Sequence, residues 1–346
     1  MISKKLSKTL LSINIIFALM IVYMHATNIK IYDYNTSRFG SLFNTFQIIM
    51  SKDILAVCVP GFFIISAYLF YINLEFNTIK TKIFKRIKTI FVPYLIWNTI
   101  ALLYFFIISN LFSNLMNMNK IELTFQTLFS GIFLFQYSPV NWFIYQLIIF
   151  ILLSPILYVV CSNKKSCIIS MIIISILVLF NYNNSFISTS SFMPCLRIDS
   201  LLYYVFGIYM AKHNNILENI EQNFSMYKAC AIFLISQIII YVDYLSQYNL
   251  FFIGVILYFI ALIRFFYGKY WKFLDKSFTS FFVFQIHGFI LEPIEKIIFL
   301  VFGNRIVFGV LDYFIAPIIC LIFIYIITII MKKYTPGFYK LLVGGR

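Results

Sequence analysis

The sequence predicts an all-α polytopic membrane protein with about ten transmembrane helices and with the N-terminus and the C-terminus both in the cytoplasm. Hydrophobic residues make up 62% of the chain, charged residues only 11%, and the mean hydropathy is +0.92. A soluble domain of this size does not need so much apolar surface. We expect residues 1–346 to form a single integral-membrane domain.

Apolar runs long enough to cross a hydrocarbon core of roughly 30 Å recur along the chain. They lie at about 9–28, 54–73, 89–112, 141–161, 166–182, 196–211, 228–245, 249–267, 278–300 and 308–331. With the N-terminus inside, most of the 27 Lys and Arg residues fall on the cytoplasmic side, which is the positive-inside pattern. The formal net charge of +15 therefore reflects the orientation of the chain in the membrane, and nucleic acid is excluded as a partner.

The stretches between the spans are expected to be loops, and the longest polar ones lie at about 29–53, 113–122, 183–197 and 212–227. Residues 121–137 are apolar but too short for a full span, so we interpret them as a re-entrant or interfacial segment. The first run resembles a signal peptide, but its length and the lack of a cleavage site predict an uncleaved helix.

The cysteines and short motifs exclude several classes of chemistry. The six cysteines form no CxxC pair, and only Cys195 falls near the outer surface. This pattern indicates packing and predicts neither a disulfide framework nor a metal site. There is no P-loop, no GxGxxG and no HExxH, so nucleotide hydrolysis and dinucleotide redox chemistry have no support.

His25 lies inside the first apolar run and is one of three histidines in the chain. An ionisable residue within a membrane span is a candidate functional residue. Asn14 precedes it by about three helical turns, roughly 16 Å along the axis, so both lie on one face of the helix. On position alone, a histidine that reaches the outer headgroups or packs between helices is the favoured explanation of His25.

Two further segments contain residues that suit helix packing or the binding of a donor. In VPGFFIISAYLF (59–70), Pro60-Gly61 is expected to loosen the backbone, and Ser66-Ala67 permits a close helix contact. In KIFKRIKTIFVPYLIWN (82–98), Lys85, Arg86 and Lys88 either anchor the helix at the cytoplasmic surface or bind the phosphates of a cytosolic donor.

The remaining candidates follow later in the chain. The segment FQIHGFILEPIEKI (284–297) places His287 near the middle of a span and Glu292 and Glu295 toward its outer end. Trp142 opens the span that begins at about residue 141, and Arg197 with Asp199 is expected to form a local ion pair.

The order of these motifs resembles the membrane-bound acyltransferase-3 family. The sequence YMHA is followed by FFIISAYLF, KRIKTIFVPYLIWN, NWFIYQLIIFILLSPIL and FQIH, and the likeness extends from about residue 10 to 330. Within this family, the sequence is most similar to surface-polysaccharide O-acetyltransferases. The resemblance implies transfer of an acyl group, usually acetyl, from cytosolic acyl-CoA to a hydroxyl of an envelope polysaccharide or glycolipid, at the plasma membrane of a bacterium.

The resemblance also assigns roles to residues. His25 matches the family histidine and is the expected general base, whereas Asn14 stands where the family has arginine. Arg86, Ser66 and Trp142 match other family positions, with Ala67 where glycine is usual. The expected site residues are catalytic (His25, His287), donor-binding (Asn14, Arg86, Lys85, Lys88, Ser66) and acceptor-binding (Trp142, Glu292). No metal and no permanently bound cofactor are expected. Acyl-CoA (acetyl-CoA) is expected as the donor substrate.

Two other functions suit the same pattern. A transporter or flippase that moves a glycan or a small solute would also have ten helices and an internal histidine. A sensor or scaffold derived from an inactive acyltransferase is the third option, because Asn14 lacks the charge of arginine. The expected partners are the acyl-CoA donor, the envelope glycan acceptor, the lipid bilayer and, as an option, a second copy in a homodimer.

Overall fold

The computed structural model describes residues 3–111, 119–180, 196–213, 217–246, 249–271 and 279–345, and all regular secondary structure in these ranges is helical. The longer helices are α1 (Lys4–His25), α2 (Arg38–Ile49), α3 (Cys58–Tyr71), α5 (Val92–Leu111), α8 (Trp142–Leu152), α10 (Lys164–Phe180), α11 (Ile198–Lys212), α13 (Met226–Ser246), α14 (Phe251–Phe266), α16 (Ser280–Phe302) and α17 (Ile306–Tyr334). The shorter ones are α4 (Ile79–Arg86), α7 (Phe125–Phe133), α9 (Ser154–Val160), α12 (Ile220–Asn223) and α18 (Pro336–Leu342), with π-helical turns η1 (Met50–Ile54) and η3 (Ile87–Phe91) and 3-10 turns η2 (Phe76–Thr78) and η4 (Pro139–Asn141).

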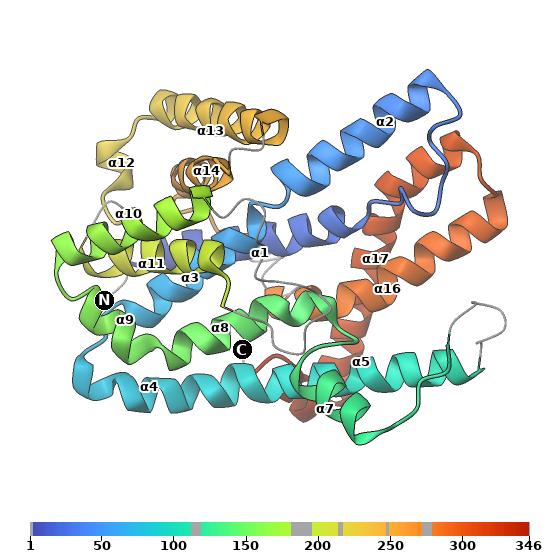
Figure 1. The fold of residues 1–346 in the computed structure, drawn as a ribbon, viewed down its shortest axis with the longest axis horizontal. Coiled ribbons are helices and arrows are strands. Elements are labelled where there is room, and N and C mark those ends of the chain that lie inside the picture. The colour runs from blue at the N-terminus through green and yellow to red at the C-terminus, as the bar shows by residue number, and fades with distance from the viewer. Residues whose placement is uncertain are drawn as a thin grey trace.

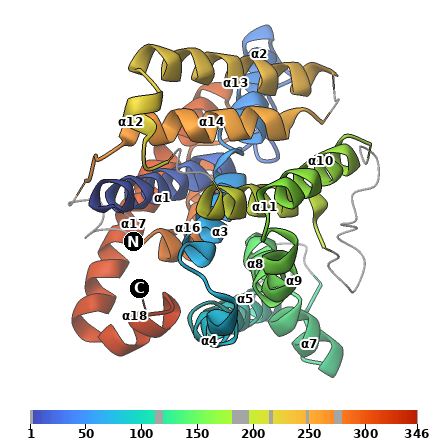
Figure 2. The same ribbon diagram turned by 90° about the vertical axis from the view of Figure 1, so that its left-hand side faces the viewer.

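Helix α1 lies at the centre of the molecule. In both views α13 and α14 form the upper layer, α4 and α5 the lower one, and α1, α3 and α11 lie between them (Figures 1 and 2). Helix α1 packs against α3, α14 and α16. Leu6, Leu10, Ile13, Phe17 and Ile21 are buried on it at helical spacing, so the central helix is held by apolar contacts along most of its length.

Five helical stretches are long and apolar enough to cross a membrane: Lys4–His25, Arg38–Tyr71, Phe76–Leu111, Met226–Ser246 and Ile306–Tyr334. The pair Pro139–Leu152 and Ser154–Val160, bent by 63°, makes a sixth if it is one span. The other four predicted spans coincide with α10, α11 and α14, which have 17, 15 and 16 residues, and with α16, which carries Glu292, Glu295 and Lys296. The chain is a multi-helix membrane protein, and the count of ten and the cytoplasmic termini stay predictions.

The structure differs from the sequence prediction at 29–53 and at Pro60-Gly61, and it agrees with the prediction that 121–137 is too short to span. The predicted loop at 29–53 contains α2, because Phe39, Leu42 and Phe46 recur at helical spacing. Pro60-Gly61 does not loosen the chain: the break lies earlier, at η1 and the turn after it, and Pro60 sits in the first turn of α3, where its missing N–H costs nothing. Helix α7, in the segment 121–137, has nine residues, too few for the roughly 20 needed to span.

The contact between α3 and α11 depends on small residues, as expected from Ser66-Ala67. A Cβ on Gly207 of α11 would lie 2.4 Å from the carbonyl oxygen of Ile64 and 2.7 Å from Cβ of Ala67. Neither atom can move without shifting the α3 backbone. Glycine at position 207 therefore lets the two helices pack with their backbones nearly in contact.

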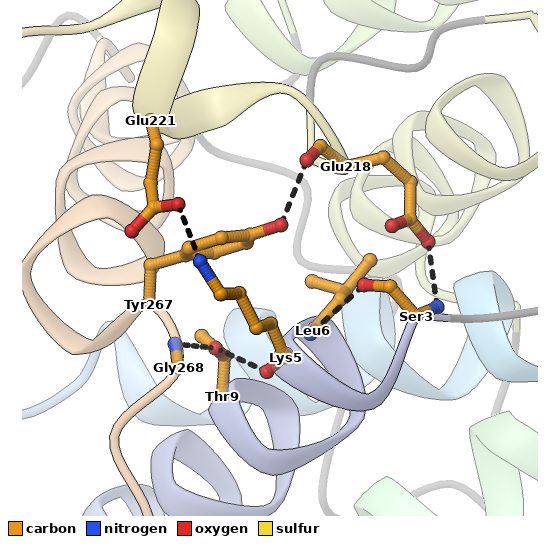
Figure 3. A network of polar contacts seen from close by, with 8 residues as sticks. All are labelled: Ser3, Lys5, Leu6, Thr9, Glu218, Glu221, Tyr267 and Gly268. Carbon is orange, nitrogen blue, oxygen red and sulfur yellow. Dashed lines mark hydrogen bonds and ion pairs between the residues drawn. The ribbon is translucent and has the colours of Figure 1, made fainter.

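A polar network attaches the start of α1 to the segment before α13 and to the end of α14 (Figure 3). Ser3 caps the helix by accepting from the Leu6 N–H, and Lys5 Nζ lies 3.0 Å from a Glu221 carboxylate oxygen. The hydroxyl of Thr9, which is fully buried, accepts from the Gly268 N–H at 2.8 Å and donates to the Lys5 carbonyl at 2.9 Å. The exposed ion pair adds little stability, so the buried threonine is the stronger attachment.

We predict that Gly207→Ala destabilises the protein by about 1–3 kcal/mol, because the added methyl group overpacks the contact between α3 and α11. Thermal unfolding of the purified protein in detergent measures the effect. Gly337→Ala is the matched control, since nothing lies within 4 Å of a Cβ at that position. Equal melting temperatures for the two variants would contradict the packing argument.

Candidate active site

Two cavities lie along α1. The basic cavity, about 530 Å³, is lined on α1 by Asn14 and elsewhere by Ser66, Arg86, Tyr204 and Lys332. The histidine cavity, about 330 Å³, is lined by His25, Trp142, Arg197, Asp199 and Tyr203. The basic cavity takes its α1 residues from the N-terminal half of the helix, and the histidine cavity takes them from the last turns.

The basic cavity is suited to an anion. Arg86 is the last residue of α4, directly before the π-turn η3, and among the described residues no carboxylate lies within salt-bridge distance of it. Arg86 interacts electrostatically with Tyr204, whose buried hydroxyl has no hydrogen-bond partner among the described atoms. A guanidinium beside an unpartnered hydroxyl offers several donors to phosphate oxygens.

His25 is the last residue of α1, and its side chain is exposed to the histidine cavity. The end of the helix is fixed by Ser51 of η1, whose hydroxyl donates to the Met24 carbonyl at 2.5 Å. The imidazole rings of His25 and His287 lie 5.0 Å apart, centroid to centroid, and are tilted by 41°. The structure therefore brings together the two histidines that were predicted to be catalytic.

His287 is buried and lines neither cavity. Its Nδ1 lies 2.8 Å from the Phe284 carbonyl and 3.2 Å from the Val283 carbonyl. A carbonyl only accepts, so hydrogen bonding assigns the proton to Nδ1 and leaves Nε2 as an acceptor. That Nε2 has no partner among the described residues, and His287 is connected to the histidine cavity through its ring contact with His25.

Trp142 lines the histidine cavity and is held there by Arg197. The guanidinium carbon lies 4.4 Å from the centre of the indole ring, and Arg197 donates to both carboxylate oxygens of Asp199 at 3.0 and 2.6 Å. The predicted ion pair is confirmed. Beneath Trp142, Asn141 donates to the Asn98 side-chain oxygen at 2.6 Å, which fixes the start of α8 on α5.

The acyltransferase-3 family model, described as an acyltransferase domain, matches residues 12–342. The chain belongs to the acyltransferase-3 family. It is a membrane acyltransferase, and the match covers every polar residue that lines the two cavities. No curated protein and no solved structure gives a match to the chain.

Besides His287, three predicted site residues of this acyltransferase lie outside both cavities. Lys85 and Lys88 are exposed on either side of Arg86, because successive helical residues point about 100° apart. Glu292 is also exposed and interacts with Tyr104 of α5. The predicted donor residues Asn14, Ser66 and Arg86, by contrast, line one cavity together.

The acyltransferase also has a buried polar cluster just after His25, which sequence reasoning did not assemble. Asn28 donates to Asp312 at 3.1 Å and accepts from the Tyr34 hydroxyl at 2.8 Å. Burial and the nearby carboxyls of Asp312 and Glu295 raise the pKa of Tyr32 to about 12. An acidic residue in the last apolar run was the available signal. The cluster fixes the chain that leaves α1.

Proposed function

We propose that the protein transfers an acetyl group from cytosolic acetyl-CoA to a hydroxyl of a cell-envelope polysaccharide or glycolipid, with His25 as the general base. The observation that carries this proposal is the pair of cavities along one helix, the first with Arg86 and Lys332 and the second with His25. In the orientation that the positive-inside pattern predicts, the basic cavity faces the cytoplasm of a bacterium and the histidine cavity faces outward.

The donor binds in the basic cavity. Arg86 holds a phosphate of acyl-CoA in bidentate fashion, and Lys332 adds a second positive charge. Asn14 lacks the charge of the family arginine, but Arg86 lines the same cavity, so the guanidinium that the donor needs is supplied from α4 in place of α1.

The acceptor enters the histidine cavity, where Trp142 offers an apolar surface to a sugar ring. The hydroxyl oxygen attacks the thioester carbonyl carbon, a carbon–oxygen bond forms and the carbon–sulfur bond breaks. His25 takes the hydroxyl proton and returns it to the leaving thiolate. His287 is a positioning residue, because its ring lies 5.0 Å from that of His25.

We predict that His25→Gln lowers acyl transfer by about 10²–10⁴-fold, because the general base is lost while the ring's volume is nearly kept. Envelope-bound O-acetyl groups in cells and thiol release by the purified protein are the measurements. His213→Gln is the matched control: this histidine contacts the Cys161 carbonyl at 2.7 Å and lines neither cavity. Full acyl transfer by the His25→Gln variant would contradict the assignment of His25 as the general base.

We predict that Arg86→Ala weakens the binding of acyl-CoA by about tenfold or more, since it removes hydrogen bonds to a charged group. Thermal stabilisation of the purified protein by CoA measures the affinity. Lys88→Ala removes an equal charge two residues away, outside the cavity, and should leave the affinity within about twofold. The same loss in both variants would indicate nonspecific charge attraction.

We predict that Asn14→Arg strengthens acyl-CoA binding several-fold, because a third cation then lines the basic cavity. CoA titrations followed by thermal unfolding compare it with Asn110→Arg, whose side chain is exposed and lines neither cavity. An unchanged affinity would mean that position 14 does not contact the donor.

A further inference from the structure

Two residues, Phe143 and Phe284, line both cavities, and no other described residue does so. Phe143 lies in the first turn of α8 and Phe284 in α16. Their ring centroids are 5.5 Å apart, with the planes at 64°, and each residue is 6% exposed. We call this pair the aromatic partition, because it forms the wall at which the two cavities meet.

The aromatic partition is supported from α3. The consecutive residues Phe62 and Phe63 line the basic cavity and the histidine cavity respectively. Their ring centroids lie 5.9 and 4.5 Å from that of Phe143. Phe143 is therefore held between one ring from each cavity.

The other half of the partition adjoins the histidines. The ring of Phe284 lies 6.4 Å from that of His287, and His287 lies 5.0 Å from His25. The carbonyl of Phe284 also accepts from His287 Nδ1. A group that passes Phe284 from the basic cavity thus arrives beside the histidine pair.

We propose that the aromatic partition sets the acyl specificity of the enzyme. The acyl end of the donor passes between Phe143 and Phe284 to meet the acceptor oxygen beside His25, and the two rings admit only a short, unbranched chain such as acetyl. This inference rests on the proposed function and adds to it the substrate class of the acyl group and the residues that choose it.

The chemistry allows the specificity to be measured without the natural acceptor. With a hydroxyl, the acceptor oxygen bonds to the carbonyl carbon, the carbon–sulfur bond breaks, and the proton passes through His25 to the thiolate. With water as the nucleophile, the same bonds form and break, and the products are a carboxylic acid and CoA thiol. Thiol release therefore reports passage of the acyl group with either nucleophile.

The test compares kcat/KM for thiol release from acetyl-CoA, butyryl-CoA and hexanoyl-CoA by the purified full-length protein in detergent. The wild type should prefer acetyl-CoA. Phe284→Ala and Phe143→Ala should each raise the ratio of butyryl to acetyl turnover by about tenfold or more, since each methylene in an apolar pocket changes selectivity by about that factor. Phe281→Ala is the matched control, because Phe281 lies on the same helix, is 5% exposed and lines only the basic cavity.

The outcomes separate the partition from the proposed function. Phe284→Leu, a smaller change, serves as the test variant if the alanine variants do not fold. An active wild type whose chain-length ratio is unchanged in the partition variants overturns the specificity inference alone, and so does an equal change in Phe281→Ala. A folded wild type that neither binds nor cleaves any acyl-CoA overturns the proposed function and the inference together.

Discussion

The contact between Phe17 of α1 and Gly61 of α3 is the constraint on which the rest of the structure depends. A Cβ at Gly61 would lie 2.2 Å from Cε2 of Phe17, so glycine alone lets the ring lie against the backbone of α3. Along α1, Phe17 falls between Asn14 of the basic cavity and Ile21 of the histidine cavity. The middle of the central helix therefore packs directly on α3, and the residues of α1 that line the two cavities lie on either side of this contact. That arrangement suits the transfer of a small group better than the passage of a whole solute.

Most of the fold could be predicted because apolar runs and helices coincide. Each of the ten predicted spans overlaps a helix or a bent pair of helices. The sequence could not show which of them cross, since α10, α11 and α14 have fewer residues than a bilayer core needs. Helix α2 was missed because its polar residues outweighed the helical spacing of Phe39, Leu42 and Phe46. Pro60 was misjudged because its effect depends on where the helix begins.

Site residues could be predicted from the sequence where a single unusual side chain marks the position. His25 and Trp142 both line a cavity, and each is an unusual side chain for the apolar run that contains it. Position within a cluster was not predictable. Lys85 and Arg86 have the same charge, and only the helical phase, which depends on neighbouring helices, turns one of them inward. The partition rings could not be found at all, because phenylalanine is among the commonest residues of this chain.

The two cavities also differ in how their charges are balanced. Arg86 lines the basic cavity, and no carboxylate is among the described residues that line it, whereas Arg197 and Asp199 at the histidine cavity neutralise each other through two hydrogen bonds. Dissolved salt should therefore screen the positive potential of the basic cavity more strongly than it affects the paired charges of the histidine cavity. Ionic strength is accordingly expected to affect the binding of charged ligands more in the basic cavity than in the histidine cavity.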